Sequence, residues 1–232
     1  MGTIRKTGAA VALCASLAFL LTLGASRASA DTITYNITSP NSDLSGFTGP
    51  YATVKVDLTS STTATITFTS DTNGGYIYLM GATRAVDLNV NGPFTLGTVT
   101  ETNSIGGFKP TFDTYGSGNV DGMGNFNLIL INKDGFKDSA TTISFTLTLT
   151  SGTWSSAADV LTPNAGGFVA AIHGFACSEA GSGCTTATAT GAIATGYAGN
   201  GPGTPTPEPA SLVLFGTGLL VLGTKLRRRP KA

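Results

Sequence analysis

The sequence predicts an all-β protein: an antiparallel β-sandwich or jelly-roll-like domain between an N-terminal signal peptide and a single C-terminal transmembrane helix. First, apolar and polar residues alternate with a period of two over many short segments, which places one face of each strand on a core. Second, turn sequences containing Gly, Asn and Asp separate these segments. Third, only 11% of the 232 residues are charged, and Thr, Ser and Gly are abundant. Many short strands of this kind are typical of sandwiches and jelly rolls.

Residues 1–30 have the three parts of a secretory signal peptide. Arg5 and Lys6 form a positive start, and an apolar stretch follows over residues 9–25. Ala28-Ser29-Ala30 is a small-x-small cleavage site, with Ala28 and Ala30 at the two small positions. We therefore expect cleavage after Ala30 and exclude residues 1–30 from the fold.

The alternating runs are the expected strands of the domain. Their apolar residues are Val54, Val56 and Leu58; Ala64, Ile66 and Phe68; Val86, Leu88 and Val90; Phe126, Leu128 and Leu130; and Ile143, Phe145, Leu147 and Leu149. The residues between them, such as Thr65, Thr67, Asp87 and Asn89, are expected to face water. The turns between the runs are predicted at residues 71–75, 91–93, 121–122 and 134–135.

The composition changes toward the end of the domain. Between residues 187 and 203 the chain turns to Ala, Thr and Gly and then to Pro, which indicates a last weak strand followed by a linker. The expected organisation is a signal peptide over 1–30, a β-sandwich over 31–195, a Gly/Pro/Thr linker over 196–206 and a tail over 207–232.

Cys177 and Cys184 are the cysteines of the expected mature chain, and six residues separate them. In an oxidising envelope a disulfide is the default, and closing this small loop contributes roughly 2–3 kcal/mol. The alternative is a metal or redox pair. A structural zinc site needs four ligands, and His173 is the chain's one histidine, so the disulfide is favoured.

The tail has a short polar motif, an apolar stretch and a basic end. Pro207, Glu208 and Pro209 precede the stretch from Ala210 to Leu226, in which Lys225 is the one charged residue. As a helix this stretch spans roughly 25 Å, the lower limit for crossing a membrane. The basic end consists of Lys225, Arg227, Arg228, Arg229 and Lys231. These cations are expected on the cytoplasmic side, with everything before Pro207 outside the cytoplasm.

This tail resembles the PEP-CTERM sorting signal in all three parts: Pro207-Glu208-Pro209, then ASLVLFGTGLLVLG, then KLRRRPK. The resemblance covers about the last 26 residues. It implies export by the Sec machinery and recognition by an exosortase, a membrane-embedded cysteine protease or transpeptidase. It also implies removal of the tail near the motif and passage of the product to the cell surface, in envelope-bearing bacteria that make exopolysaccharide. The resemblance carries over no catalytic residue.

The apparent neutrality of the chain comes from its two ends. The chain has 13 basic and 13 acidic residues, but three of the basic ones lie in the signal peptide and five in the tail. Residues 31–206 retain five basic and twelve acidic residues, a net charge near −7. This acidity argues against nucleic acid as a partner. Contact with the membrane is expected through the C-terminal helix before the tail is removed.

No sequence pattern indicates a catalytic site. His173 and Asp159 could form a triad with one of many serines, but the sequence has no Gly-x-Ser-x-Gly elbow, and Gly181-Ser182-Gly183 is the nearest approach. Residues 166–174, with 154–159 before them, resemble segments of small PEP-CTERM ectodomains of unknown activity, which implies no mechanism. His173 is therefore interpreted as a strand-end or loop residue.

Acidic and aromatic residues give two further candidates. Asp113, Asp121, Asp134 and Asp138 lie in turn-like sequence, where Asp is locally favoured, and nothing fixes the carboxylate separation that glycosidases need. Residues 119–125 weakly resemble a calcium loop but lack the final bidentate Glu, so a turn is favoured over calcium. The aromatic residues that could stack on sugars are Tyr76, Tyr78, Phe108, Phe112, Tyr115 and Trp154.

The sequence therefore predicts an exported protein of the cell envelope, outer surface or extracellular matrix. We expect it to be anchored in the membrane transiently through the C-terminal helix, to have a non-enzymatic structural or interaction role and to use no cofactor. Its expected partners are the Sec machinery, an exosortase and exopolysaccharide. A carbohydrate-binding module is the alternative, and a secreted hydrolase is the third possibility.

Overall fold

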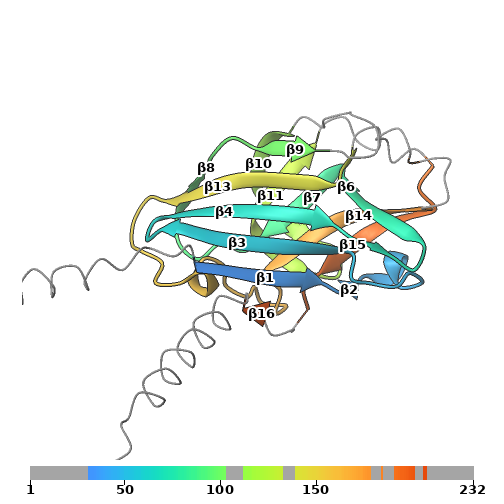
Figure 1. Cartoon of the computed structure of the whole chain (residues 1–232), viewed down its shortest axis with the longest axis horizontal. Helices are drawn as coiled ribbons and strands as arrows, with labels where there is room; N and C mark the ends of the chain where they lie inside the picture. Colours follow the sequence, from blue (N-terminus) through green and yellow to red (C-terminus); the bar gives the residue numbers. More distant parts are fainter. Residues whose placement is uncertain are drawn as a thin grey trace, which may run out of the picture. The chain divides into compact units, whose positions relative to one another are not determined.

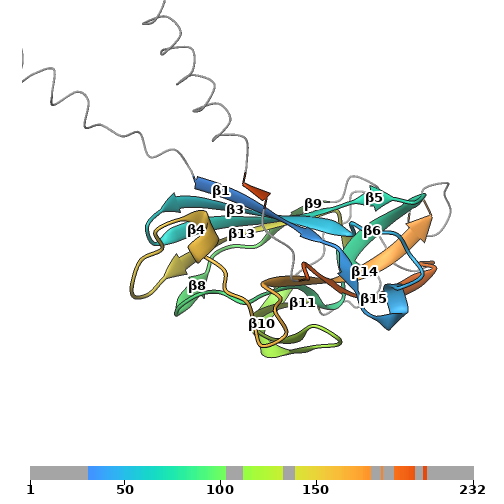
Figure 2. The same ribbon diagram turned by 90° about the horizontal axis from the view of Figure 1, so that it is seen from below.

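Two antiparallel β-sheets pack face to face in the computed structural model of this protein (Figures 1 and 2). The structure describes residues 31–102, 112–132, 139–178, 184, 191–201 and 206–207. All of them belong to one compact unit that begins at Asp31. The all-β prediction is confirmed, whereas the signal peptide and most of the C-terminal tail lie outside the described residues.

The described elements are short strands and two single-turn 3₁₀ helices. The strands are β1 (Asp31–Ile37), β2 (Ser39–Pro40), β3 (Ala52–Ser60), β4 (Thr63–Ser70), β5 (Thr72–Asn73), β6 (Tyr76–Gly81), β7 (Thr83–Leu88), β8 (Phe94–Leu96), β9 (Thr100–Thr102), β10 (Phe112–Val120), β11 (Gly124–Asn132), β12 (Ser139–Ala140), β13 (Thr142–Leu149), β14 (Ala170–Ser178), β15 (Ala194–Gly199) and β16 (Thr206–Pro207). The helices are η1 (Ser42–Leu44) and η3 (Ala157–Asp159).

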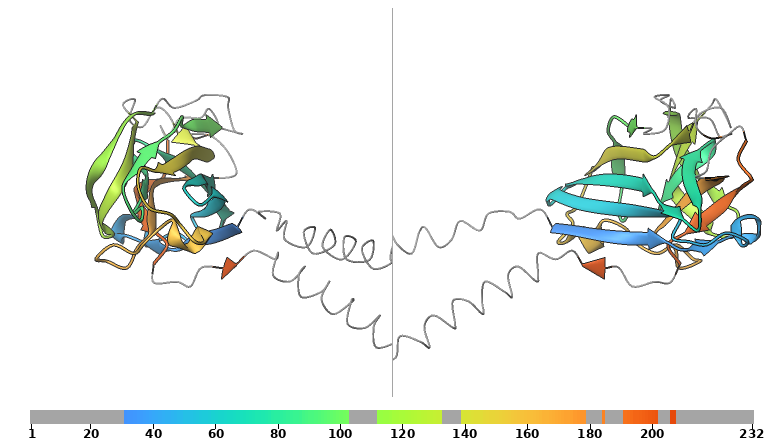
Figure 3. Two further views of the ribbon diagram at one scale, coloured as in Figure 1. Left: turned by 90° about the vertical axis from the view of Figure 1, so that its left-hand side faces the viewer. Right: turned by 45° about the vertical axis from the view of Figure 1, so that its right-hand side comes forward.

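Sheet A is a layer built around long strands of mostly regular register. Among the described residues its strand order is β16-β1-β3-β4-β13-β8, and β9 also pairs with β13. Strands β3 and β4 form a hairpin, and β13 returns beside β4 after a long crossover. Figure 3 shows the same layer from two further directions.

Sheet B forms the second layer, with the order β10-β11-β7-β14-β15-β2 among the described residues. Strand β6 pairs with β14 beside β7 and carries β5 and β12 on its other side. The β5–β6 turn is the one predicted at residues 71–75. Gly74 and Gly75 have φ angles of +61° and +82° there, as a tight two-residue hairpin turn requires.

The main core lies between the two sheets and consists of the apolar sides of the alternating strands. Ile66, Phe68 and Phe145 reach into it from sheet A, and Leu88 and Leu128 from sheet B. Each of these side chains is 2% exposed or less. The period-two pattern therefore identified the inner face of sheet A correctly.

Sheet B departs from this simple pattern, because its outer face is also covered. Leu79, Phe175, Cys177 and Cys184 form one buried cluster there. A second cluster contains Val120, Met123, Phe126, Ile129 and Ala171. Asp87 is 0% exposed, so the expectation that it faces water is wrong. Burial on both faces means that a polar residue at an outward position of this sheet is not necessarily in water.

The chain remains part of sheet B beyond residue 195. Strand β15 runs to Gly199 and pairs with both β14 and β2. Asn200 continues the packing, because its side-chain oxygen accepts hydrogen bonds from the backbone N–H groups of Val169 and Ala170. The expected boundary between sandwich and linker thus falls inside a strand. Residues 202–205 of the expected linker lie outside the described residues.

Candidate functional site

The outer face of sheet A carries a regular array of hydroxyl groups, which we call the hydroxyl face. It consists of the outward residues Thr32, Thr34, Thr53, Thr63, Thr65, Thr67, Thr69, Thr142, Ser144, Thr146 and Thr148 of β1, β3, β4 and β13. Their side chains are half-buried or exposed, and the residues between them point into the core. The alternation that builds the core therefore also builds this face.

The register of the strands places these hydroxyls in rows across the sheet. Thr53 lies opposite Thr69, which lies opposite Thr142, and Thr142 lies opposite Thr102 of β9. In the central row Thr65 lies opposite Thr146. Neighbouring strands are about 4.8 Å apart and successive outward residues about 6.7 Å apart along a strand. The result is a regular array of hydroxyl groups, a group that can both donate and accept hydrogen bonds.

Charge on this face is confined to one neutralised pair. Lys55 and Asp57, adjacent outward residues of β3, form an ion pair with 3.1 Å between Nζ and Oδ1. The Thr32 hydroxyl also donates to Oδ1 of Asp57, at 2.5 Å. Thr67 and Ser144 are joined across the strands by a 3.0 Å hydrogen bond between their hydroxyls. A neutral partner that offers both donors and acceptors therefore suits this surface better than a charged one.

Sheet B contains a different candidate, a buried polar cluster around Asp87 that the sequence analysis missed. Asp87 lies between Ile129 of β11 and Ala171 of β14, and neither of its carboxylate oxygens has a hydrogen-bond partner among the residues that the structure describes. Burial raises the pKa of the Asp87 carboxyl well above its ordinary value, and the Arg84 guanidinium opposes this shift only in part. Asp87 is therefore expected to be protonated in the folded protein at acidic pH values where an exposed carboxyl has ionised.

Arg84 reaches this cluster because the backbone of β7 is bulged. Ile129 lies opposite Asp87 and Ile131 opposite Thr83, so β7 accommodates two more residues than β11 between these pairs. Arg84 has a φ of +62°, which is costly for a residue with a side chain. Its guanidinium hydrogen-bonds Tyr197, and a Cβ at Gly118 would lie 3.5 Å from its Nη2 atom. This is an ordinary van der Waals distance, so the guanidinium packs beside β10 at Gly118.

His173 lies in the same region and is held in one tautomer. Its Nδ1 atom is 3.1 Å from the carbonyl oxygen of Thr83, an acceptor, so Nδ1 carries the proton. Its Nε2 atom is 2.8 Å from the Thr195 hydroxyl, which then donates to it. The ring stacks on Tyr197 with 4.5 Å between the ring centroids. Burial lowers the pKa of His173, so the neutral ring is the stable form.

The buried carboxyl makes a specific prediction about pH. The pKa of the Asp87 carboxyl is raised in the folded state. As pH rises through the ordinary carboxyl pKa of 3.8, the unfolded chain therefore loses the Asp87 proton before the folded protein does. Asp87 therefore lowers stability progressively from about that pH up to its own folded-state pKa. We expect Asp87→Asn to remove this loss and to raise the free energy of unfolding at pH 7 by about 1–3 kcal/mol. Urea titrations at several pH values measure both effects.

The matched control is Asp43→Asn, a change at an exposed residue of the η1 helix, which should alter stability by less than about 0.5 kcal/mol. His173 acts in the opposite direction, since its lowered pKa makes the fold less stable as pH falls below 6.5. An Asp87→Asn protein whose stability still falls with rising pH as steeply as that of the unaltered protein would show that Asp87 does not ionise as described.

The structure does not bring together the triad considered from the sequence. The Asp159 carboxylate accepts a hydrogen bond from the backbone of Ser155 and lies near Tyr35 of β1, whereas His173 lies on the outer face of sheet B. The two ring nitrogens of His173 contact a carbonyl and a threonine hydroxyl. His173 is within strand β14 and not at its end or in a loop, so that part of the interpretation is wrong. Residues 181–183 lie outside the described residues.

The other sequence candidates are mainly structural where the structure describes them. Residues 119–125 form the turn and first pairs of the β10–β11 hairpin, and Asp121 accepts a hydrogen bond from Asn41. Tyr78 is fully buried, and Trp154 is 2% exposed and donates its indole N–H to Asn91. Tyr76 is half-buried against Phe47. The remaining acids and aromatics are Asp113, Asp134, Asp138, Phe108, Phe112 and Tyr115, whose side chains lie outside the described parts.

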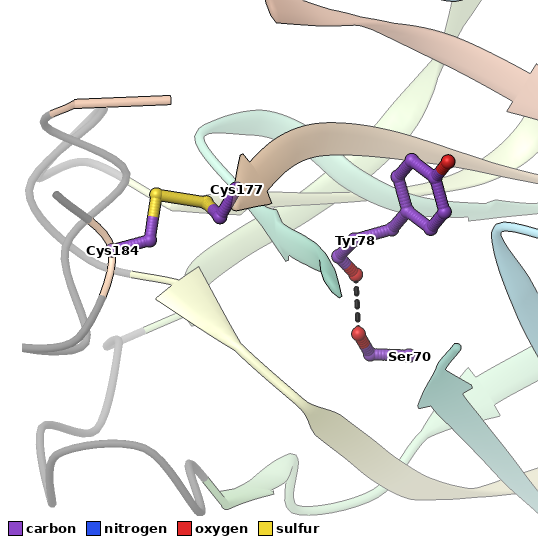
Figure 4. Close-up of a disulfide and its surroundings, with 4 residues drawn as sticks. All are labelled: Ser70, Tyr78, Cys177 and Cys184. Atoms are coloured by element: carbon purple, nitrogen blue, oxygen red, sulfur yellow. Dashed lines mark hydrogen bonds between the residues drawn. A yellow bond between two sulfur atoms is a disulfide. The ribbon is translucent and has the colours of Figure 1, made fainter. Parts of the chain in front are cut away.

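Cys177 and Cys184 form the predicted disulfide (Figure 4). Cys177 lies near the end of β14, and both cysteines pack in the outer cluster of sheet B with Leu79 and Phe175. Figure 4 also shows the hydrogen bond from the Ser70 hydroxyl to the carbonyl of Tyr78, which joins the end of β4 to β6. The disulfide thus closes a loop beside a strand that the core already holds.

The start of the tail lies against the sandwich. Pro207 belongs to strand β16, which pairs with β1 at the edge of sheet A (Figure 1). Ala28, Ala30, Glu208, Pro209 and the basic residues Lys225, Arg227, Arg228, Arg229 and Lys231 lie outside the described residues. In the part of the chain that the structure does describe, no helix is both long enough and apolar enough to cross a membrane.

The described residues thus form a disulfide-bonded all-β domain. Comparison with protein families finds the PEP-CTERM protein-sorting motif at residues 205–229. The motif identifies the chain as an exported protein that is targeted to an exosortase for sorting to the surface. No match was found among curated proteins or among solved structures.

Proposed function

We propose that this protein is a non-enzymatic component of the cell surface or extracellular matrix that binds exopolysaccharide through its hydroxyl face. The observation that carries the proposal is the register of sheet A, which places the outward Thr hydroxyls of β4 opposite the Thr and Ser hydroxyls of β13 and continues one of these rows to Thr53 of β3. Sugar hydroxyls both donate and accept hydrogen bonds, as do those of Thr and Ser. The array therefore matches the chemistry of a neutral polysaccharide chain.

Rigidity of the array supports this proposal. Thr is β-branched and stiff at χ1, and its backbone is fixed here by hydrogen bonds to strands on both sides. Such hydroxyls lose little conformational entropy when a ligand binds, so weak individual hydrogen bonds can add up over the face. The aromatic stacking that many sugar sites use is not needed, in keeping with the burial of Tyr78 and Trp154.

The alternative of a carbohydrate-binding module with an aromatic platform receives less support, because Tyr78 and Trp154 are buried. The hydrolase hypothesis has one observation in its favour, the 2.8 Å contact between Thr195 and His173. However, Thr195 lies in a regular strand opposite Phe175, unlike the strained turn that exposes the nucleophile in hydrolases of the Gly-x-Ser-x-Gly type. We therefore assign this contact a structural role and propose no catalytic residue.

The test removes hydroxyls from the face without changing its shape. Thr65→Val/Thr146→Val replaces the opposed pair in the central row with side chains of the same size. We expect this variant to bind the polysaccharide secreted by the producing cells about fivefold or more weakly, because each hydrogen bond contributes about 0.5–1.5 kcal/mol. Sedimentation of the protein with the purified polysaccharide measures the affinity.

The matched control is Thr38→Val/Thr83→Val, which removes two hydroxyls outside the hydroxyl face. We expect the control to bind as the unaltered domain does. Equal affinities for both double variants would rule out the hydroxyl face as the binding surface. If neither the unaltered domain nor the variants bind this polysaccharide or any glycan of an array, the exopolysaccharide role is ruled out altogether.

A further inference from the structure

The sorting motif begins on the folded domain and not beyond it. Strand β16 consists of Thr206 and Pro207, which lie opposite Thr34 and Ile33 of β1 in antiparallel register. Both residues fall inside the 205–229 match, and Pro207 is the first residue of Pro-Glu-Pro. Figures 1 and 3 show β16 beside β1, which is otherwise an edge strand of sheet A.

The pairing uses the main chain of Thr206 in particular. Pro207 has no N–H group, so Thr206 is the residue of β16 that can donate to β1. In an antiparallel pair the residue that donates toward its neighbour also accepts from it, so the N–H and C=O of Thr206 both point at Thr34. These groups cannot at the same time bind another extended partner.

An enzyme that binds this segment in an extended form needs the same main-chain N–H and C=O groups of Thr206. Proteins commonly capture extended peptides by main-chain hydrogen bonds of the kind a β-strand makes. While Thr206 is paired with Thr34, its main-chain groups are occupied and the sandwich stands directly beside the motif. A pairing of two residues is short, so it can open locally without unfolding the two sheets.

We propose that the outer edge of β1 is an intramolecular docking site for the start of the sorting motif, and that it competes with the sorting enzyme for Thr206 and Pro207. The undocked state is the one that the enzyme binds, and the docked state withholds the motif. The edge of the domain thereby sets the rate at which the folded protein is sorted. This inference does not depend on the polysaccharide role.

The test locks the docked state in the full chain with Thr34→Cys/Thr206→Cys. The two positions face each other directly, at a separation typical of residues that a disulfide can bridge. We expect peptide mapping without reductant to find the new cross-link in most chains. We then expect the cross-linked protein to reach the surface of cells at least tenfold less efficiently than each single-cysteine variant, as measured by surface labelling.

Asn36→Cys/Thr206→Cys is the out-of-register control, because Asn36 lies two residues along β1 from Thr34 on the same face. It should form little cross-link and reach the surface normally. Cross-linking that is as efficient with Asn36 as with Thr34, or absent from both, would overturn the docking site. A cross-linked Thr34–Thr206 protein that reaches the surface as fast as the single variants would overturn the competition.

A second variant shifts the equilibrium between docked and undocked β16 toward the undocked state. Thr34→Pro removes the N–H group that faces β16, at a position on an edge strand where proline is tolerated. If this variant melts as the unaltered protein does, we expect it to reach the surface faster, by about twofold or more. A folded Thr34→Pro protein with an unchanged or lower rate of sorting would contradict the proposal even where the cysteine variants fail to fold.

Discussion

Replacing Phe68 with alanine is expected to destabilise the domain by about 3–5 kcal/mol, which is the usual cost of removing a buried phenylalanine. Phe68 of β4 is 0% exposed, and its ring centroid lies 6.4 Å from that of Phe145 on the neighbouring β13. Both rings fill the space between the two sheets, so neither sheet can close the cavity without moving the other. Urea denaturation of the purified domain measures the loss.

Thr67→Ala, one residue away on the outward side of the same strand, is the control for this substitution. It should cost about 1 kcal/mol or less, since it removes one half-buried hydroxyl and its 3.0 Å bond to Ser144. If the two substitutions cost the same, β4 does not have the inward and outward sides described above, and the hydroxyl face would lose its basis.

Removing the disulfide is expected to have the next largest effect. Cys177→Ala/Cys184→Ala opens a loop with a sequence separation of 7, for which chain entropy gives a loss of about 2–3 kcal/mol. Alanine is chosen because Cys177 is 0% exposed and a serine hydroxyl would be buried there. The midpoint of urea unfolding should fall accordingly.

Reduction of the unaltered domain provides an independent measurement of the same bond. Dithiothreitol should lower the unfolding midpoint of the unaltered domain and leave that of the double-alanine variant unchanged. A midpoint that reduction does not move would mean that the bond contributes nothing to folding. In that case the packing of the two cysteines against Leu79 and Phe175 would be enough to hold them in place.

The sequence was sufficient to predict the features that depend on neighbouring residues. Alternation in 64–68 and 143–149 correctly identified which residues of sheet A face the core, because each strand has one wet face. The short spacing of Cys177 and Cys184 predicted their disulfide correctly. The three-part pattern of the tail predicted the sorting motif, which the family comparison confirms.

Features that depend on long-range pairing could not be predicted in this way. Asp87 occupies an outward position of β7, and alternation alone places it in water. It is buried because β7 lies between β11 and β14 in a sheet whose outer face is also covered. The approach of Arg84 depends on a bulge that no local pattern in the sequence marks. The rows of the hydroxyl face likewise depend on the register between strands far apart in the chain.

The sorting motif and the domain are linked more closely than the sequence indicated. A linker was expected over 196–206, but β15 extends to Gly199 and Thr206 already pairs with β1. Six residues therefore separate the end of β15 from Thr206, and the match to the sorting motif begins within them at residue 205. We therefore propose separate roles for two sides of sheet A: sorting for its β1 edge and polysaccharide binding for its hydroxyl face.

The most direct test of the binding role is a titration of the domain, with its threonine methyl groups isotopically labelled, against the purified exopolysaccharide. Methyl resonances report which threonines the ligand reaches. We predict that Thr65, Thr67 and Thr146 shift or broaden as the polysaccharide is added, whereas Thr83 and Thr195 on sheet B do not. Shifts confined to the sheet B threonines, or no shifts at a saturating concentration, would contradict the assignment of the hydroxyl face.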